Sequence, residues 1–259
     1  MKTKYPIILV HGIMIKDFKR FKAFGKIEKI LKEQGFSVYS SKTDGFGTIE
    51  NNALMLKEQV LEILEKENVD KVNLICHSKG GLDSKYMIKE LGMEEKVASL
   101  TTLCTPHKGS KIANKLLQMP KFIIKIIAFW LNLTYKMFGD KAPDSIEVAK
   151  QLSCIDSVES ETISFSDKIY CQSFSSEMKK STDDFVMGIP LIFSKFFEKD
   201  KTDGLVSAES SKFENYRGVC LDESVSHSEI VDFMVKKKKR EKIHGFYINL
   251  CKELQEMGF

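Results

Sequence analysis

Short apolar runs rich in β-branched residues alternate with longer segments of helical periodicity along the 259-residue chain. The runs lack a polar face, which is typical of parallel strands that are covered on both sides. This alternation predicts an α/β fold with a mostly parallel central sheet of about six strands flanked by helices. The expected strands are 6–10, 36–40, 72–76, 98–104, 168–172 and 217–221, and the expected helices are 18–33, 52–67, 80–91, 121–138 and 241–256.

The segment between the fourth and fifth expected strands is too long for a simple connection. Its centre, PKFIIKIIAFWLNLTYKMFG, is apolar on nearly every side and contains Trp130, the only tryptophan of the chain. A helix this apolar is buried, inserted in a membrane or laid over an apolar site. Lysines interrupt it and it is short for a membrane span, so no transmembrane segment is expected. We expect a helical lid or cap at about 110–165, either mobile or permanently packed on the core.

No internal repeat, low-complexity linker or change of composition divides the chain, so a single domain over residues 1–259 is expected. The net charge is only +4, and nearly all basic residues are lysines. Nucleic-acid binding favours a dense basic face with arginine forks, so no nucleic-acid partner is expected. The run KKKKR at 236–240 is interpreted as a solvated helix end, with contact to anionic lipid as the alternative.

The six cysteines are spread along the chain without metal-like spacing, and four of them lie inside apolar stretches. Such cysteines behave as small buried hydrophobes, which favours reduced thiols and a reducing compartment. A strand-like run also begins close to Met1, which leaves no room for a signal peptide. These features predict a cytoplasmic location, or a secreted one if a leader has been removed.

The stretch KVNLICHSKGG, residues 71–81, runs from a buried strand into a serine followed by two glycines. A nucleophile elbow is written G-x-S-x-G and requires a strand, a tight turn and a helix in that order. The segment supplies this context and makes Ser78 a candidate nucleophile. Cys76 replaces the first glycine of the pattern, and it is the smallest departure available after alanine or serine.

A tetrahedral oxyanion needs backbone donors near the serine. Lys79 follows Ser78, so its N–H would point into an oxyanion hole from the start of the helix. The first strand ends in His11-Gly12, and the next residue, Ile13, could offer a second N–H. His11 itself is interpreted as structural, because a base this early leaves no plausible chain order for a triad.

The acid and the base of a triad are found late in the chain. Asp203 lies in DKTDGLVS, and His227 follows 24 residues later in DESVSHSEIVD, directly after the last expected strand. His227 is the only histidine at a strand-to-helix junction after Asp203. The order Ser78, Asp203, His227 is that of the α/β-hydrolases.

Four blocks carry a resemblance to a known family: YPIILVHG, VNLICHSKGGLDSKYM, LTTLCTPHKGS and TDGLVS…SHSEIVD. Together they resemble the bacterial triacylglycerol lipases, the true-lipase branch of the α/β-hydrolase fold. The resemblance covers most of the chain and loses clarity in 111–200. It implies Ser78 as nucleophile, Asp203 as acid, His227 as base, and Ile13 with Lys79 as oxyanion donors.

The same resemblance implies that Leu205 and Val206 lie near the acyl-binding cleft and that 111–165 carries the lid helices. Trp130 in the lid is a further candidate for substrate contact. The chain departs from the family pattern where Cys76 and Cys104 replace glycines and where Lys79 replaces a glutamine. The lysine suggests a cation beside the oxyanion that could favour anionic substrates.

Calcium-dependent members of the family hold a structural ion with an acid upstream of the catalytic aspartate and another two residues after the histidine. Asp183 or Asp184 and Glu229 fall at roughly these places. The glutamate stands where the family has an aspartate, so calcium stays an open alternative. The triad chemistry itself requires no cofactor.

The sequence therefore predicts a serine carboxylic-ester hydrolase, of lipase or esterase type, that cleaves apolar acyl esters through an acyl-enzyme. The expected partners are a lipid-like or other apolar ester and, transiently, a lipid interface through the lid. An acyltransferase or thioesterase with the same triad is one alternative. A non-catalytic lipid-binding module that has kept the fold is another.

Overall fold

The computed structural model describes residues 3–13, 22–153, 165, 168–184, 187–188, 191–192 and 201–259. A six-stranded sheet of order β2-β1-β3-β4-β5-β6 forms its centre, and every pair of neighbouring strands is parallel. The strands are β1 (Ile7–Val10), β2 (Val38–Ser40), β3 (Val72–His77), β4 (Val97–Leu103), β5 (Tyr170–Ser175) and β6 (Asn215–Val219). The predicted parallel α/β architecture is confirmed.

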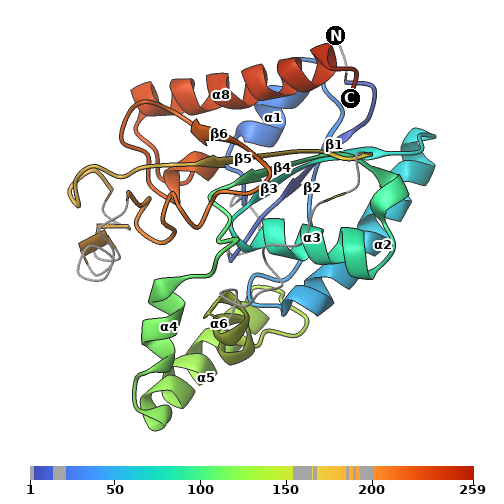
Figure 1. The fold of residues 1–259 in the computed structure, drawn as a ribbon. Helices are drawn as coiled ribbons and strands as arrows, with labels where there is room; N and C mark the ends of the chain where they lie inside the picture. The colour runs from blue at the N-terminus through green and yellow to red at the C-terminus, as the bar shows by residue number, and fades with distance from the viewer. Residues whose placement is uncertain are drawn as a thin grey trace.

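Helices cover both faces of this sheet (Figure 1). One face packs against α1 (Ile27–Glu33) and α8 (Lys237–Glu256), and the other against α2 (Ile49–Glu67) and α3 (Lys79–Glu90). Short 3-10 helices lie at η1 (Glu94–Lys96) and η3 (Glu229–Val231). Successive side chains of a strand point to opposite faces, so β1 contributes to both cores. This two-sided burial explains why the sequence of β1 has no polar face.

The observed boundaries differ from the predicted ones at both ends of the chain. The helix expected at 18–33 begins at Ile27, because Gly25 adopts a left-handed φ of 47° and packs against Asp232. Residues 18–21 of that expected helix lie outside the described residues. The last helix begins at Lys237, earlier than the predicted 241, although lysines in a first turn oppose the helix dipole. Lys239 and Arg240 form ion pairs with Glu229 and Asp232, and these pairs offset this cost.

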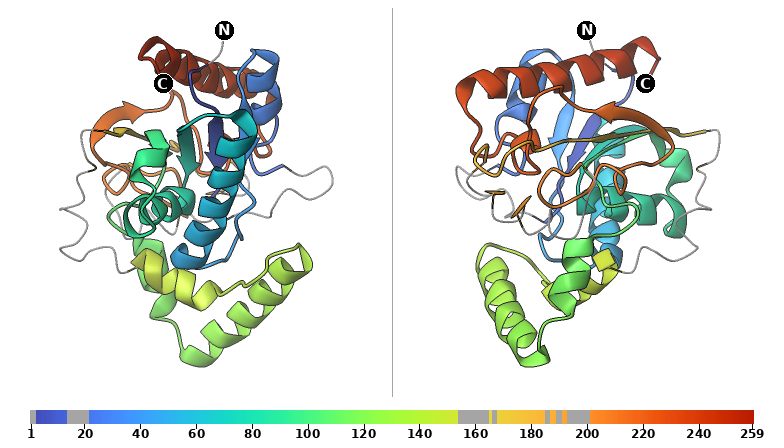
Figure 2. Two further views of the ribbon diagram at one scale, coloured as in Figure 1. Left: turned by 90° about the vertical axis from the view of Figure 1, so that its right-hand side faces the viewer. Right: turned by 60° about the vertical axis from the view of Figure 1, so that its left-hand side comes forward.

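The described part of the insertion between β4 and β5 contains three helices: α4 (Lys111–Leu117), α5 (Lys121–Met137) and α6 (Ser145–Ser153). They pack on one another and lie together below the body of the molecule (Figures 1 and 2). We call these three helices the lid. Asp140 ties the lid to the body by accepting hydrogen bonds from the backbone N–H groups of Gly45 (3.0 Å) and Phe46 (2.9 Å). Residues 154–164 of the expected insertion lie outside the described part of the chain.

The lid contains α5, which is rich in large apolar residues. Among the described residues, no single helix combines the length and hydropathy needed to cross a membrane. The pair α4 and α5 meets these criteria together, by length and composition only, and is bent by 116° between its two members.

Candidate active site

Ser78 occupies a strained turn between β3, which ends at His77, and α3, which begins at Lys79. Its φ of 53° and ψ of −132° are unusual for a residue with a side chain, and conformations of this kind cost about 1–3 kcal/mol. The surrounding chain passes too close for larger residues. A Cβ on Gly80 would lie 2.6 Å from the carbonyl oxygen of His11, and one on Gly81 would lie 2.3 Å from Oγ1 of Thr105. This is the geometry of a nucleophile elbow.

Cys76 fits into this elbow without distortion. Its side chain is fully buried, and its Sγ lies 3.1 Å from Oγ of Ser84 on α3. Burial raises the pKa of the Cys76 thiol to about 12, so the thiol stays uncharged at neutral pH. Cys76 is therefore a packing residue between strand and helix and does not compete with Ser78 as a nucleophile.

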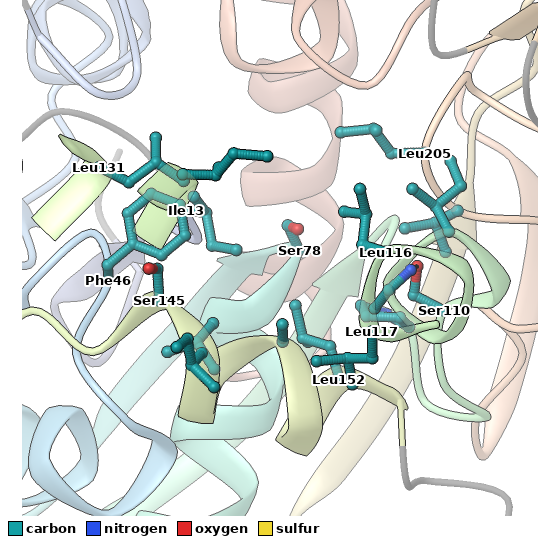
Figure 3. Close-up of a pocket in the computed structure, with 18 of the residues that line it drawn as sticks. Ile13, Phe46, Ser78, Ser110, Leu116, Leu117, Leu131, Ser145, Leu152 and Leu205 are labelled. Atoms are coloured by element: carbon teal, nitrogen blue, oxygen red, sulfur yellow. Dashed lines mark hydrogen bonds between the residues drawn. The ribbon is translucent and has the colours of Figure 1, made fainter. Parts of the chain in front are cut away.

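The backbone beside Ser78 has the arrangement expected of an oxyanion hole. Gly12 lies against the elbow, where a Cβ would be 2.7 Å from Cβ of Ser78 and 3.0 Å from the backbone nitrogen of Lys79. The next residue, Ile13, lines the same cavity as Ser78 (Figure 3). Lys79 is the first residue of α3, where backbone N–H groups have no partner within the helix. The structure thus brings Ile13 and Lys79 to the two sides of the serine.

The side chain of Lys79 does not reach the cavity. It is 1% exposed, and its Nζ lies 2.6 Å from Oδ1 of Asp83 in a buried ion pair. Asn52 donates to the other carboxylate oxygen of Asp83 at 3.0 Å. Burial raises the pKa of Asp83 to about 6, against the opposing effect of Lys79. The expectation of a cation beside the oxyanion is wrong, because one helical turn brings Asp83 under the lysine and holds its side chain inside the core.

Asp203 and His227 form a buried pair. Nδ1 of His227 lies 2.7 Å from Oδ2 of Asp203, and the backbone N–H of His227 donates to the carbonyl of Asp203 at 2.9 Å. The other carboxylate oxygen of Asp203 accepts from the backbone N–H groups of Leu205 (2.9 Å) and Val206 (2.8 Å). Four hydrogen bonds therefore fix the carboxylate and the imidazole relative to each other, which leaves Nε2 of His227 to act on a substrate or a nucleophile.

An apolar cavity of about 330 Å³ joins these groups. Figure 3 shows the Ser78 hydroxyl at the centre of a ring of apolar side chains. The lining includes His227, Leu205 and Val206 from the body. Trp130 is absent from the lining and is 61% exposed. Among the described residues the Ser78 hydroxyl has no hydrogen-bond partner, and such bonds are often open in ligand-free enzymes.

Most of the cavity wall consists of residues that no sequence motif singles out. The lid contributes apolar residues from all three of its helices, among them Leu116, Leu131 and Leu152. Phe46 joins them from the loop between β2 and α2. The high apolar content of the insertion was the only signal in the sequence for this wall. The sequence could not show which of these residues face the cavity, because that depends on how the helices dock.

His77 is a further buried group beside the pair. Its ring lies 4.5 Å from that of His227, and its Nε2 has no hydrogen-bond partner in the described structure. Burial and the neighbouring His227 hold the pKa of His77 well below its usual value, so its ring is neutral. A neutral ring adds no charge that would compete with the protonation of His227.

The candidate calcium ligands do not fit a divalent cation. Asp184 accepts hydrogen bonds from the hydroxyls of Ser226 and Ser228, and both carboxylate oxygens of Glu229 lie 2.7 Å from Nζ of Lys239. A lysine ammonium thus lies where a cation would have to bind Glu229. Asp183 instead accepts a hydrogen bond from Ser224 at 2.6 Å.

One cluster of metal-ligating residue types is found among the described residues: Cys104, Asp203 and His227, whose ligand atoms lie within 4.8 Å of one another. Asp203 and His227 already bond each other there. Burial and the nearby Asp203 raise the pKa of the Cys104 thiol well above its usual value. A neutral thiol is a poor metal ligand, so this cluster does not favour a metal either.

Known proteins resemble this chain in sequence and in fold. A model of the palmitoyl protein thioesterase family matches residues 6–152, which is more than half of the chain. The chain belongs to this family. Its sequence is also 28% identical to triacylglycerol lipase 2 of Saccharomyces cerevisiae over 264 residues, which cover 90% of this chain and 73% of the yeast protein.

Bacterial relatives match a shorter region. A triacylglycerol lipase of Pseudarthrobacter phenanthrenivorans is 37% identical over 117 residues, which cover 43% of this chain and 36% of that protein. The chain thus matches about a third of the length of this relative.

Solved structures share the fold at lower identity. Staphylococcus hyicus lipase has a TM-score of 0.69 and 14% identity, with 98% of this chain and 96% of that chain covered. A metagenomic carboxyl esterase has a TM-score of 0.73 and 13% identity, with 98% and 76% covered. The protein has the α/β-hydrolase fold and is an ester hydrolase related to the lipases, as the sequence predicts.

Proposed function

We propose that the protein hydrolyses carboxylic esters of apolar acyl groups through an acyl-enzyme on Ser78. One observation carries this proposal: the strained serine and His227, which is paired with Asp203, border the same apolar cavity. The volume of about 330 Å³ lies in the range of pockets that bind small ligands. The apolar lining supplies binding free energy for an acyl chain, while Ser78 and His227 lie at the place where the bond is cleaved.

The first half of the reaction acylates the serine. Nε2 of His227 removes the proton of the Ser78 hydroxyl as Oγ attacks the ester carbonyl carbon. Asp203 accepts the Nδ1–H of His227 and stabilises the imidazolium that forms. The carbonyl oxygen becomes an oxyanion and accepts hydrogen bonds from the Ile13 and Lys79 amides. When the tetrahedral intermediate collapses, His227 returns its proton to the departing alcohol.

The second half repeats this sequence with water. His227 removes a proton from a water molecule, which attacks the acyl carbon and releases the carboxylic acid, and Ser78 recovers its proton. His227 carries out all the proton transfers in both halves, so the proposed reaction requires no cofactor.

The decisive experiment replaces the nucleophile. Ser78→Ala should abolish hydrolysis of p-nitrophenyl esters while the circular dichroism spectrum and melting temperature stay unchanged. A fluorophosphonate should label the wild type on Ser78 and should not label the variant. Substantial turnover by Ser78→Ala would overturn the proposal, and a wild type that resists labelling would favour a non-catalytic lipid-binding module.

A thioesterase is the second candidate, because the matching family model is that of palmitoyl protein thioesterases. The same triad attacks thioesters and oxygen esters. The two candidates are separated by measuring kcat/KM for a thioester and an oxygen ester of the same acyl chain. A marked preference for the thioester would select the second candidate, and products formed with added alcohols would indicate acyl transfer.

We propose further that α5 brings the protein to its substrate by contacting a lipid surface. Its outward face carries large apolar residues one helical turn apart: Phe122, Ile126, Phe129, Trp130, Leu133 and Met137, which are 40–76% exposed. Lysines lie on the same helix, and residues 97–139 contain no acidic residue. A helix with an apolar face and flanking lysines favours the interface of a membrane with anionic lipids.

Rates against esters of increasing chain length, below and above their solubility limit, test this contact. A jump in rate above the limit supports interfacial action with a mobile lid. Smooth saturation with short esters preferred would indicate a fixed cap over a site for soluble esters.

A further inference from the structure

The loop that carries His227 is held by carboxylates on both sides of the histidine. The sequence Ser226-His227-Ser228-Glu229 forms a reciprocal turn in which Glu229 N–H donates to Oγ of Ser226 and Ser226 N–H donates to Oε2 of Glu229, both at 3.1 Å. These two bonds have the reciprocal pattern of a capping box, and they lie just before η3. His227 is thus fixed within the turn, and its direction depends on where the turn as a whole is anchored.

Asp184 anchors the turn from outside the loop. One oxygen of its buried carboxylate accepts hydrogen bonds from the hydroxyls of Ser226 and Ser228, the latter at 2.7 Å. The two serines flank His227, so this carboxylate binds both neighbours of the proposed base. The serine hydroxyls are uncharged, so this contact brings no positive charge to the Asp184 carboxylate.

Lys239 of α8 anchors the opposite side. Its Nζ lies 2.7 Å from each carboxylate oxygen of Glu229, and the side chains of Lys239 and Glu229 are only 17% and 5% exposed. Asp232, at the end of η3, bonds the neighbouring Arg240 of α8 at 2.6 Å. The acids of the loop therefore meet the basic first turn of α8, where lysines would otherwise oppose the helix dipole.

This pairing accounts for part of the run KKKKR at 236–240. Lys239 and Arg240 are held by the acids of the loop, whereas Lys236, Lys237 and Lys238 are exposed. The start of α8 also belongs to the helix layer on the far side of the sheet from α2 and α3 (Figure 1). The basic run has a structural partner within the protein.

We propose that Lys239 is a positioning residue for the catalytic base. Its ammonium group supplies, from within the chain, the positive charge that neutralises Glu229 and holds the His227 turn against α8. The hydrolase then needs no calcium ion at this place. The inference rests on the proposed role of His227 as the base.

The test uses the whole 259-residue chain and a soluble short-chain ester, so that the lid and lipid binding do not affect the readout. Lys239→Met removes the charge and keeps the apolar stem, while Lys239→Arg keeps the charge. Lys238→Met is the matched control, because Lys238 is exposed on the same turn of α8. Each protein is assayed with EDTA and with added Ca²⁺, and its melting temperature is measured.

Lys239→Met should lower kcat by about 10- to 100-fold with KM nearly unchanged, because a displaced base costs rate and not substrate affinity. Lys239→Arg should recover most of this loss, and Lys238→Met should behave as the wild type. The wild type should have the same kcat in EDTA and in Ca²⁺. A wild-type kcat in Lys239→Met, or a loss in EDTA that Ca²⁺ reverses, would overturn the inference.

Lys239→Met leaves Glu229 buried without its partner, and this variant can fail to fold. The double variant Glu229→Gln/Lys239→Met removes both charges and should keep a melting temperature near that of the wild type. Its kcat should still be lowered, and an unchanged kcat would overturn the inference. Ser78→Ala separates the two hypotheses: if it stays active, the proposed function fails, and if it is inactive while Lys239→Met is unaffected, only the role of Lys239 fails.

Discussion

The cavity has one wall formed by the sheet and another formed by the lid, and the two walls differ in how deeply their residues are buried. Every residue of β3 and β4 is buried, and these strands lead directly into Ser78 and the segment that supports it. In the lid, α4 buries only Ala113 and α5 buries only Ala128. The chain thus places Ser78 at the end of a fully buried strand and surrounds the acyl site with helices that have few buried residues.

The difference suggests a division of roles. Positions in the sheet wall should control the rate for every substrate, because they set the geometry of Ser78 and His227. Positions in the lid wall should control which substrates are accepted and how the protein meets a lipid surface. Four substitutions, taken from the largest expected effect to the smallest, can break this comparison.

Asp203→Asn should cause the largest loss. The amide has no negative charge to stabilise the imidazolium and favours the wrong tautomer of His227, so kcat should fall by about 10⁴-fold for short and long esters alike. Steady-state kinetics on both ester classes check this. A loss restricted to long esters would contradict the assignment of Asp203 to the chemistry.

Cys76→Leu should come next. Cys76 is fully buried with its Sγ 3.1 Å from Oγ of Ser84, so a larger side chain forces β3 and α3 apart under Ser78. Overpacking of this kind costs about 1–3 kcal/mol of unfolding free energy, and the activity should fall sharply as the elbow is displaced. Denaturant unfolding and ester hydrolysis measure the two effects. Cys76→Ala is the control and should keep most of the activity, whereas a fully active leucine variant would mean that the elbow is assigned wrongly.

Ala128→Phe tests the lid wall. Ala128 is buried and lines the cavity, so a phenylalanine there should fill part of the space for the acyl chain. We expect kcat/KM to fall by about tenfold for long acyl chains and to stay nearly unchanged for acetate esters, because the lost contacts are apolar. An equal loss for acetate would show that α5 also positions the chemistry.

Trp130→Ser should have the smallest effect on turnover. Trp130 is 61% exposed and is not part of the cavity wall, so hydrolysis of soluble esters should be unchanged. Binding to vesicles that contain phosphatidylglycerol should weaken by about 1–3 kcal/mol, since a large aromatic anchor is lost from the interface. Vesicle co-sedimentation measures this, with phosphatidylcholine vesicles and the variant Lys125→Glu as tests of the charge contribution. Unchanged vesicle binding by Trp130→Ser would show that the outward face of α5 does not contact the lipid surface.

Local patterns were sufficient to predict much of the fold and the candidate site. All six expected strands exist, because unbroken apolar runs are the direct consequence of burial on both faces of a parallel sheet. Asp203 and His227 could also be found from the sequence, because their chain order after Ser78 is that of a triad, and the structure pairs them although Asp203 lies between β5 and β6 and His227 lies after β6. The edge strand β6 lies at 215–219 and not at 217–221, because half-exposed strands carry a weaker apolar pattern.

The errors concern side chains whose direction depends on a partner far away or one turn along a helix. The sequence could show that Lys79 follows the serine, but only the packing of α3 placed its ammonium on Asp83 and out of the cavity. It could show an acid after His227, but only the docking of α8 paired that acid with Lys239.

The sequence by itself determined the order of the strands along the chain, the elbow at Ser78, the acid and base candidates and the presence of an apolar insertion. Each depends on residues that are close in sequence, where backbone geometry and hydrophobic periodicity act directly. The tertiary structure decided which face of the insertion lines the cavity, where the buried lysines find their counter-charges and which residues anchor the His227 turn. These contacts join segments that are distant along the chain, so their partners become defined only when the helices dock.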